Sequence, residues 1–406
     1  HQRRLADIRI AYQRDAHERA AVAALNGHLA VDLRQLLLET ADAVADYAAV
    51  GYVTGLGDKW SSYIPADQYE AYRMSSEGTG CGIGVSVTST ADTVRISIVY
   101  DDSPAAQAGI VKGDYILGAE GLTVEKDGAN AVISAIRGEE GTDVSVTIQT
   151  SAGETKTLTM KRATVTQKMA WGEMLSGNTG YIRIENFHTG VAKQFQNVLD
   201  TLTGEGMTSL VIDVRHNGGG RVKEMSAALD PLLGEGTIMT LRMKNGSETV
   251  YTSDADCIDL PIAVLIDDQS ISAAEFFAAA LQEYERATLV GTHTTGKGRA
   301  QRTYQLSDGS AVNLSVEEYF TPKGKSLADV GIAPDIEVKL TDEQTQNFFF
   351  LTSETDPQLQ KAMEKNGVPY VSHVYDNAPH SISTGRGTDA EGWLNEAVAF
   401  WEEQTK

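Results

Sequence analysis

The second half of the chain alternates two kinds of segment, and this alternation constrains the fold more than any other feature of the sequence. From about residue 166, apolar runs typical of buried strands are followed by segments with apolar residues at helical spacing. Parallel strands need long crossover connections, which are usually helices. The order therefore predicts an α/β core with a largely parallel sheet. Strands are expected at 180–184, 209–214, 261–266, 288–291 and 311–316, and helices at 191–202, 222–233 and 273–287.

Residues 77–165 have a different pattern, because polar and apolar residues alternate there with the period of two that is typical of strands. Ser103 followed by Pro104 predicts the start of a short helix, with Ser103 as its cap. Residues 129–136 predict a second helix. The segment is therefore expected to be a small β-rich module with two helices.

The two ends of the chain are expected to be helical, at 4–25 and 33–50 and again near 356–366 and 391–404. Amphipathic helices at a terminus either pack against a partner or cover their own domain, and both alternatives stay open here. The sequence begins with His1 rather than Met, so we expect a processed or trimmed chain whose signal or anchor preceded it.

Composition excludes several classes of function. Hydrophobic residues make up 41% of the 406 residues, which is enough for a sizeable core, but the net charge is −22. Such acidity argues against nucleic acid as a partner, and we attribute it to solubility. The two cysteines, Cys81 and Cys257, are too far apart in sequence for a CxxC pair, although a single bond between them stays open. No metal or cofactor is expected, and no apolar run reaches the roughly 18 residues of a membrane span.

Ser272 lies between an expected strand and an expected helix. The first N–H groups of a helix have no partner within the helix, and the dipole there is positive. A nucleophile at this point has oxyanion donors within reach, including the N–H of Ala273. The alternative is structural, because Ser272 and Glu275 also have the spacing of a capping box, which needs no catalysis.

Lys297 is the candidate base, because it is flanked by two glycines that allow the backbone a tight path. A lysine must be neutral to accept the serine proton, so its pKa must fall from ~10.4 toward ~7, which burial can achieve. Gln301, four residues later, lies on the same face of a strand or helix and is expected to orient the amine. The alternative is an exposed loop lysine with no catalytic role.

A third segment ends a buried strand in three consecutive glycines, residues 218–220. Such a loop presents bare N–H groups to an anion, and neither phosphate-binding glycine motif is present. We therefore expect a second oxyanion donor from Gly218 or Gly219. His216 and His293 lie near these motifs, so a serine–histidine pair is an open alternative.

In this order, the three segments resemble the carboxyl-terminal processing peptidases, also called tail-specific proteases or peptidase family S41. The family core reads roughly DLRxNxGG, then a SASASE-like turn, then GKG with a glutamine four residues after the lysine. The matching segments here are 213–220, 270–275 and 296–301, and the family's GIxPD is matched at 331–335. Each motif is weak alone, but the ordered set is specific and covers about 30–366. Gly218 replaces a usual proline and Ala274 a common serine, and neither change removes a proposed catalytic group.

The resemblance implies a PDZ domain inserted at about 80–165. In such a domain, backbone N–H groups hold a terminal carboxylate while the peptide adds a strand to the sheet. The partners implied are proteins or peptides with free C-termini. The expected carboxylate-binding residues are Gly82, Ile83, Gly84 and Val85. Arg137 lies in a segment that matches the family's IRG, and we hypothesise that it couples tail binding to the active site; the alternative is a surface arginine.

Together these observations predict an α/β, ClpP/crotonase-like serine protease core with an inserted β-rich PDZ domain and helical termini. The expected divisions are a helical region (1–76), the PDZ domain (77–165), the core (166–345) and a helical region with tail (346–406). The expected function is serine endopeptidase, cleaving substrates selected by their C-terminal tails with Ser272, Lys297 and Gln301. The alternative is a non-catalytic PDZ scaffold that only binds peptides. The resemblance also implies an exported protein, and the helical ends suggest a homodimer.

Overall fold

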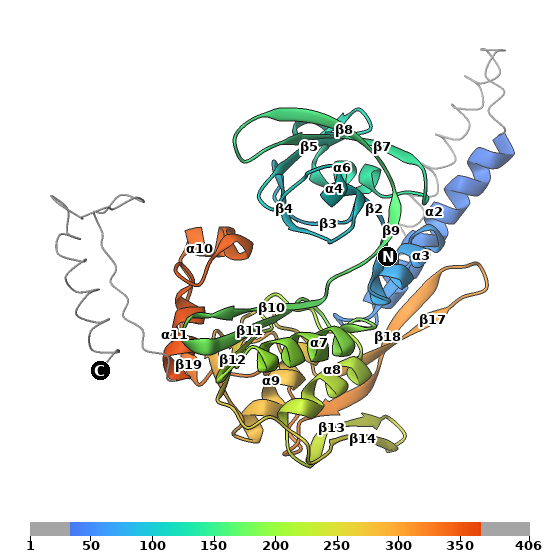
Figure 1. Ribbon diagram of the computed structural model, residues 1–406. Coiled ribbons are helices and arrows are strands. Elements are labelled where there is room, and N and C mark those ends of the chain that lie inside the picture. Colours follow the sequence, from blue (N-terminus) through green and yellow to red (C-terminus); the bar gives the residue numbers. More distant parts are fainter. Residues whose placement is uncertain (1–32, 367–406) are drawn as a thin grey trace. The chain divides into compact units, whose positions relative to one another are not determined.

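The computed structural model describes residues 33–366 of the chain (Figure 1). The helices predicted at 4–25 and 391–404 lie outside these residues. The described chain divides into a first unit, residues 33–69 and 302–315, and a second unit, residues 70–301 and 316–366. No helix of the described residues is long and apolar enough to cross a membrane.

The first unit contains α2 (Leu33–Thr54) and β1 (Ser62–Ile64). The predicted helix at 33–50 is therefore present and extends to Thr54. β1 pairs in antiparallel register with the start of β18 (Ala311–Phe320). The preceding strand β17 (Arg299–Gln305) also pairs with β18, so the hairpin formed by these two strands connects the two units in sequence.

The second unit begins within α3 (Ala66–Ser76) and continues into the β-rich module, in which five strands follow the order β3-β4-β5-β7-β8 and β6 pairs with β5. Strands β2 and β9 pair with each other where the chain enters and leaves the module. Figure 1 shows α4 and α6 enclosed by these strands. The elements are β2 (Thr79–Gly82), β3 (Val85–Ser89), β4 (Val94–Val99), α4 (Pro104–Gln107), β5 (Tyr115–Ala119), β6 (Leu122–Thr123), α5 (Val124–Asp127), α6 (Ala129–Ile136), β7 (Asp143–Gln149), β8 (Thr155–Lys161) and β9 (Ala163–Thr166).

Local sequence explains the turn into α4. The Ser103 hydroxyl accepts the N–H of Ala106 (3.1 Å), and Pro104 occupies the first helical position. The predicted short helix and its cap are therefore present. Apolar residues from the strands and helices of the β-rich module, among them Ile96, Val132 and Val146, are fully buried and form the module's own core.

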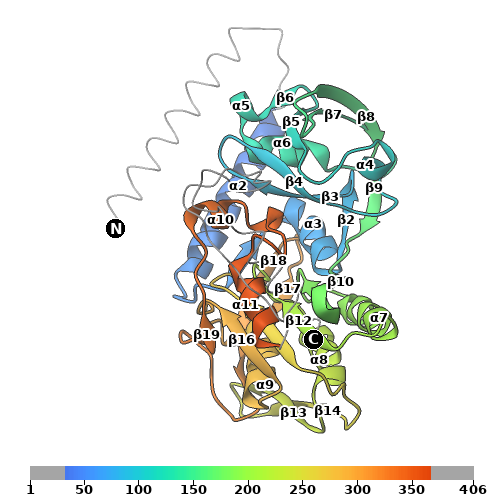
Figure 2. The same ribbon diagram turned by 60° about the vertical axis from the view of Figure 1, so that its left-hand side comes forward.

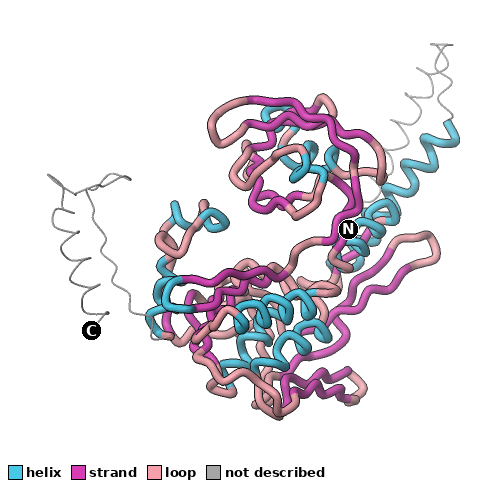
Figure 3. The backbone as a smooth tube through the Cα atoms, in the orientation of Figure 1, coloured by secondary structure: helices cyan, strands magenta, loops and turns pink. Residues whose placement is uncertain are grey.

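The α/β core is built on a six-stranded sheet in the order β10-β11-β12-β15-β16-β19. Strands β11, β12, β15, β16 and β19 are parallel, whereas the edge strand β10 is antiparallel to β11. Figure 3 shows that the module is mainly strand, whereas the core mixes helices and strands. The elements are β10 (Ala170–Leu175), β11 (Thr179–Ile184), α7 (Val191–Gly204), β12 (Ser209–Asp213), α8 (Val222–Leu229), β13 (Gly236–Met243), β14 (Glu248–Ser253), β15 (Ile262–Ile266), α9 (Ala273–Glu283), β16 (Ala287–Gly291), β19 (Ile336–Glu337), α10 (Asp342–Gln346) and α11 (Pro357–Lys365), with short 3-10 turns η1 (Ser176–Asn178), η2 (Asp230–Leu232) and η3 (Phe348–Phe350).

Both faces of this sheet are buried, as expected for parallel strands. One face packs against α7, α8 and α9. Alternate residues of the same strands, such as Val211 and Leu265, face the other way and pack against Leu359 and Met363 of α11. Figure 2 shows α11 beside β12 and β16. Because β12 and β15 are parallel neighbours, their carboxyl ends lie at the same edge of the sheet.

Several predicted boundaries were wrong for local reasons. The helix expected over 222–233 ends at Leu229, where η2 contains Pro231, a residue that lacks the N–H needed to continue an α-helix. The helix expected over 273–287 ends at Glu283, because Glu285 adopts a left-handed conformation with φ 56°. Cys81 and Cys257 are both free thiols, so no bond joins them.

Candidate active site

Ser272 occupies a sharp turn between β15 and α9. It has φ 58°, which is rare for a residue other than glycine, and only 5% of its surface is exposed. The next residue, Ala273, begins α9, so its N–H has no partner within the helix. That N–H donates no hydrogen bond among the described residues. The turn therefore places a buried hydroxyl beside an available backbone donor.

The Glu275 carboxylate connects this turn to the lysine loop. It is fully buried, and its Oε2 accepts the N–H of Ser272 (2.8 Å) and the N–H of Lys297 (2.8 Å). Its Oε1 accepts the Thr294 hydroxyl (2.7 Å) and the N–H of Gly296 (2.7 Å). The carboxylate half of the predicted capping box thus exists, but its greater effect is to hold two distant loops together.

Lys297 is partly buried, and its Nζ donates to Gln301 Oε1 at 2.6 Å. The two flanking glycines explain why the loop can run so close to its neighbours. A Cβ on Gly298 would lie 2.3 Å from the N atom of Ala328, and Gly296 has φ 87°. The structure therefore brings Lys297 and Gln301 together, as predicted.

The glycine loop after β12 lies against the turn at Ser272. A Cβ on Gly219 would lie 2.9 Å from Ser272 Cβ and 3.1 Å from the N atom of Ala273. The Asn217 side chain accepts the N–H of Gly219 (2.9 Å), and the Asn217 carbonyl accepts the N–H of Ile271 (2.9 Å). The N–H of Gly219 is thus already used, whereas exposed Gly218 donates no hydrogen bond among the described residues.

An ion network fixes the start of this loop. Asp213, at the end of β12, is fully buried and bonds Arg215 through Nη2 (2.6 Å) and Arg183 through Nη1 (3.1 Å). Arg215 also bonds Asp356 (2.7 Å). Burial alone would raise the pKa of Asp213, but the two guanidinium groups outweigh it and hold this pKa well below its usual range. The network anchors the segment that leads to Asn217.

The two histidines have other partners. His216 Nδ1 lies 2.5 Å from Asp267 Oδ2, and its ring stacks on Phe348 with centroids 4.1 Å apart. His293 Nδ1 lies 3.0 Å from the carbonyl of Thr294. Neither arrangement pairs an imidazole with Ser272, so the geometry does not favour the serine–histidine alternative.

Tyr319 is a neighbour of Ser272 that the sequence did not reveal. It lies on β18, is 4% exposed, and its N–H donates to the carbonyl of Gly298 (3.0 Å). Its ring packs on Phe276 of α9, with centroids 4.9 Å apart. Burial raises the pKa of Tyr319 to about 12, although its interaction with the Ser272 side chain opposes this rise. No local motif marks this residue, because it reaches the site only through the pairing of distant strands.

The predicted carboxylate-binding residues line a cavity of about 300 Å³ in the β-rich module. Gly82 ends β2, Ile83 and Gly84 form the connection, and Val85 begins the edge strand β3. Ile133 and Ile136 of α6 line the same cavity. Ile83 is buried, whereas Arg137 is exposed at the end of α6 and lines the same cavity. Its guanidinium forms no ion pair or hydrogen bond among the described residues. The groove lining is Gly82, Ile83, Gly84, Val85 and Arg137, together with neighbouring apolar residues.

The fold is an α/β core with an inserted PDZ-like module. Its candidate site joins a buried serine at the start of a helix to a loop that carries a lysine. These features are typical of one class of serine peptidase. The sequence profile of peptidase family S41 matches residues 178–338, and that of the PDZ domain matches residues 95–150. The chain belongs to peptidase family S41 and contains a PDZ domain, as the sequence predicted. The predicted fold class is thereby confirmed.

Known relatives support this membership. The chain is 31% identical to the carboxy-terminal processing protease CtpA of Bacillus subtilis, over 74% of its own length and 65% of the relative's. It is 32% identical to the carboxy-terminal-processing protease of Bartonella bacilliformis, over 70% of its own length and 67% of the relative's. It thus spans about two thirds of either protein. A solved S41 structure from Bacteroides fragilis shares the fold with a TM-score of 0.55 and 18% identity, covering 77% of this chain and 88% of that one.

Proposed function

We propose that this protein is a serine endopeptidase that processes the C-terminal regions of polypeptides. The Ser272 hydroxyl attacks the scissile carbonyl and forms an acyl-enzyme, while its proton passes to the Lys297 amine. The amine then gives this proton to the departing amino group, and water releases the acyl group with the same amine as base. Gln301 orients the amine through the hydrogen bond that it accepts.

The observation that carries this proposal is the shared carboxylate oxygen of Glu275. Because one atom accepts the backbone N–H groups of both Ser272 and Lys297, the serine turn and the lysine loop are held together, which supports the pairing of a nucleophile with a base. We assign the oxyanion donors to Ala273 and Gly218, since the N–H of Gly219 is donated to Asn217. A non-catalytic scaffold would not need this arrangement.

The PDZ domain is proposed to select substrates by a free C-terminus. The groove beside β3 has the edge strand to which an extended peptide can add, and Arg137 supplies a positive charge near it. We keep the hypothesis that Arg137 couples tail binding to the active site. Unchanged cleavage by Arg137→Ala, with peptides that carry a free tail, would count against the coupling.

One experiment tests both parts of the proposal. A single peptide is prepared with a free and with an amidated C-terminus, and its cleavage by the wild type, Ser272→Ala and Lys297→Ala is compared. We expect cleavage by the wild type only, and faster cleavage of the free form. Equal cleavage by all three proteins refutes the mechanism, whereas equal cleavage of both peptide forms refutes only tail selection.

We further propose a homodimer formed through the N-terminal helical region. In support, α2 and the turn after it expose large apolar side chains, including Tyr47, Tyr52 and Leu56, at 80%, 75% and 54%. Tyr47→Glu is expected to convert the dimer to a monomer in light scattering, and a wild-type monomer would refute this proposal.

Export to the periplasm or cell envelope is also proposed from the family, and cell fractionation tests it. We propose the division 1–76, 77–165, 166–345 and 346–406, and the two profile matches lie within the second and third parts.

A further inference from the structure

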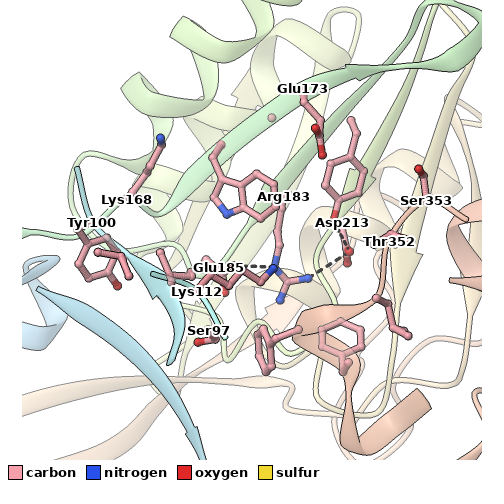
Figure 4. A pocket seen from close by; sticks show the side chains of 18 of the residues that line it. Ser97, Tyr100, Lys112, Lys168, Glu173, Arg183, Glu185, Asp213, Thr352 and Ser353 are labelled. Atoms are coloured by element: carbon pink, nitrogen blue, oxygen red, sulfur yellow. Dashed lines mark hydrogen bonds and ion pairs between the residues drawn. The ribbon is translucent and has the colours of Figure 1, made fainter. Parts of the chain in front are cut away.

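A second cavity, of about 900 Å³, lies between the PDZ domain and one face of the core sheet (Figure 4). Residues of β4 and the loop after α4 line one side, and β10, β11 and the 348–353 segment line the other. Its size is within the range of ligand-binding sites. The groove opposite α6 has a different lining apart from Tyr100, so this cavity is not the proposed tail-binding site.

Most charges in this cavity are already paired. Figure 4 shows Arg183 bonded to both Glu185 and Asp213, at 2.6 and 3.1 Å. Lys168, on the rim, pairs with Asp101 (2.9 Å). These pairs leave little unbalanced charge on the floor of the cavity.

Lys112 is the cation of the cavity lining that has no carboxylate partner among the described residues. It is exposed at the rim, and it forms no ion pair or hydrogen bond within residues 33–366. Partial burial, and then the like charge of Arg183, lower the pKa of Lys112. Its amine lies 5.6 Å from the ring centre of Phe350. Glu173, which is exposed, is the other charged residue of the cavity lining that forms no ion pair within the described part of the chain. The charges of Glu185 and Glu173 oppose this lowering of the pKa, and a carboxylate from a ligand would add a direct partner to their attraction.

Two further groups lack hydrogen-bond partners. The Trp171 Nε1 atom is buried in the cavity wall and has no acceptor among the described residues. β10 is an edge strand, so one side of its backbone has no neighbouring strand. The N–H of Glu185 donates to the carbonyl of Met169 (2.7 Å). In an antiparallel pair, every second residue bonds to the neighbouring strand, so the backbone groups of Met169, Trp171 and Glu173 face β11. The backbone groups of Gly172 and Met174 therefore point away from β11, and Gly172 lines the cavity.

We propose that this cavity is a second substrate-binding site, in which an extended polypeptide segment pairs with the free edge of β10. An acidic side chain of that segment accepts hydrogen bonds from Lys112 and from Trp171 Nε1. The partly buried ring of Phe349 covers a neighbouring apolar side chain of the peptide. The proposal deepens the proposed function, because it rests on that function for the polypeptide nature of the ligand.

Binding is measured on the Ser272→Ala protein, which prevents turnover, by fluorescence anisotropy. The probe is a short labelled peptide with alternating β-branched residues, an amidated C-terminus and a central Glu or Gln. The amide keeps the probe independent of tail recognition, so failure here is distinguishable from failure of the proposed function. Lys112→Gln and Trp171→Phe are compared with Lys126→Gln, which changes an exposed lysine outside the cavity.

We expect the Glu peptide to bind about fivefold more tightly than the Gln peptide, which corresponds to about 1 kcal/mol. Lys112→Gln should abolish this preference, Trp171→Phe should reduce it, and Lys126→Gln should leave it intact. N-methylation of alternate peptide N–H groups should prevent binding for one set of positions and not for the other. Because the chain carries a net charge of −22, a preference for Glu would have to arise locally. Equal affinities for the two peptides, or indifference to both N-methyl patterns, would overturn the proposal.

Discussion

The Glu275 carboxylate offers the sharpest test of how the site is held together. Replacing it with Ala removes the acceptor of three backbone N–H groups and one hydroxyl. Glu275→Gln is milder, because the amide keeps one oxygen. If that oxygen remains between Ser272 and Lys297, the new NH₂ group can donate to the Thr294 oxygen, but the Thr294 O–H and the N–H of Gly296 both lose their acceptor.

The expected losses follow from this count. An unpaired buried donor costs about 1–3 kcal/mol. Glu275→Gln should therefore lower the free energy of unfolding by about 2 kcal/mol, and Glu275→Ala by about 4 kcal/mol, less whatever water restores. Activity should fall further than stability, since a displacement of about 1 Å between reacting groups costs roughly 100-fold in rate. We expect at least 100-fold slower cleavage for Ala and about tenfold for Gln.

The measurements are urea unfolding, and steady-state cleavage of the free-tail peptide without urea at the same temperature. Glu285→Gln is the matched control, because Glu285 is exposed just beyond the end of the same helix. Its stability and rate should equal those of the wild type. Wild-type kcat in Glu275→Ala, or a larger loss for Gln than for Ala, would show that this carboxylate does not position the two loops.

Three other changes test neighbouring features. Gly219→Ala should abolish cleavage, because the new Cβ would lie 2.9 Å from Ser272 Cβ, whereas Gly234→Ala, in open space, should not; an active Gly219→Ala refutes the close approach. Tyr319→Phe should lower kcat about tenfold without changing KM. Because the pKa of Tyr319 is raised from 10.0 to about 12, its stabilisation is complete below pH 10 and lost as pH rises toward 12, so the variant should resist alkaline unfolding better; equal alkaline midpoints contradict this. Asp213→Asn should cost about 3–5 kcal/mol in urea unfolding, since it leaves buried guanidinium groups unpaired. The pKa of Asp213 is lowered in the folded state, so its contribution to stability is present above its ordinary pKa of 3.8 and disappears as pH falls through the folded value. The free energy of unfolding should therefore depend less on pH in the acid range in this variant.

Sequence patterns were sufficient for the parts of the fold that depend on neighbouring residues. The predicted strands at 209–214 and 261–266 are present, because continuous apolar runs of this length suit a sheet that is buried on both faces. Ser103 and Pro104 likewise specified a short helix through their own chemistry. The edge strand β10 was not predicted, because its order of Trp, Gly and Glu has no regular alternation.

The candidate site divides in the same way. Lys297 and Gln301 were linked by their spacing alone, and the structure joins their side chains. Glu275 was recognised only as a helix cap, because the sequence could not show that a loop about twenty residues later would bring two more N–H groups to it. Tyr319 was missed for the same reason, since its position depends on the pairing of β13 with β18 and on contacts with Gly298 and Phe276.

This division has a physical cause that bears on how the site can change. A nucleophile at a helix start needs only its own turn, so a substitution there acts within a few residues. The base lies on a separate loop, and its distance from the nucleophile depends on contacts that no single segment contains. Four hydrogen bonds to the buried Glu275 carboxylate join the lysine loop to the serine turn. Any movement of the lysine loop must therefore break bonds that also support the serine turn. It follows that the two halves of the site should lose their order together rather than one after the other.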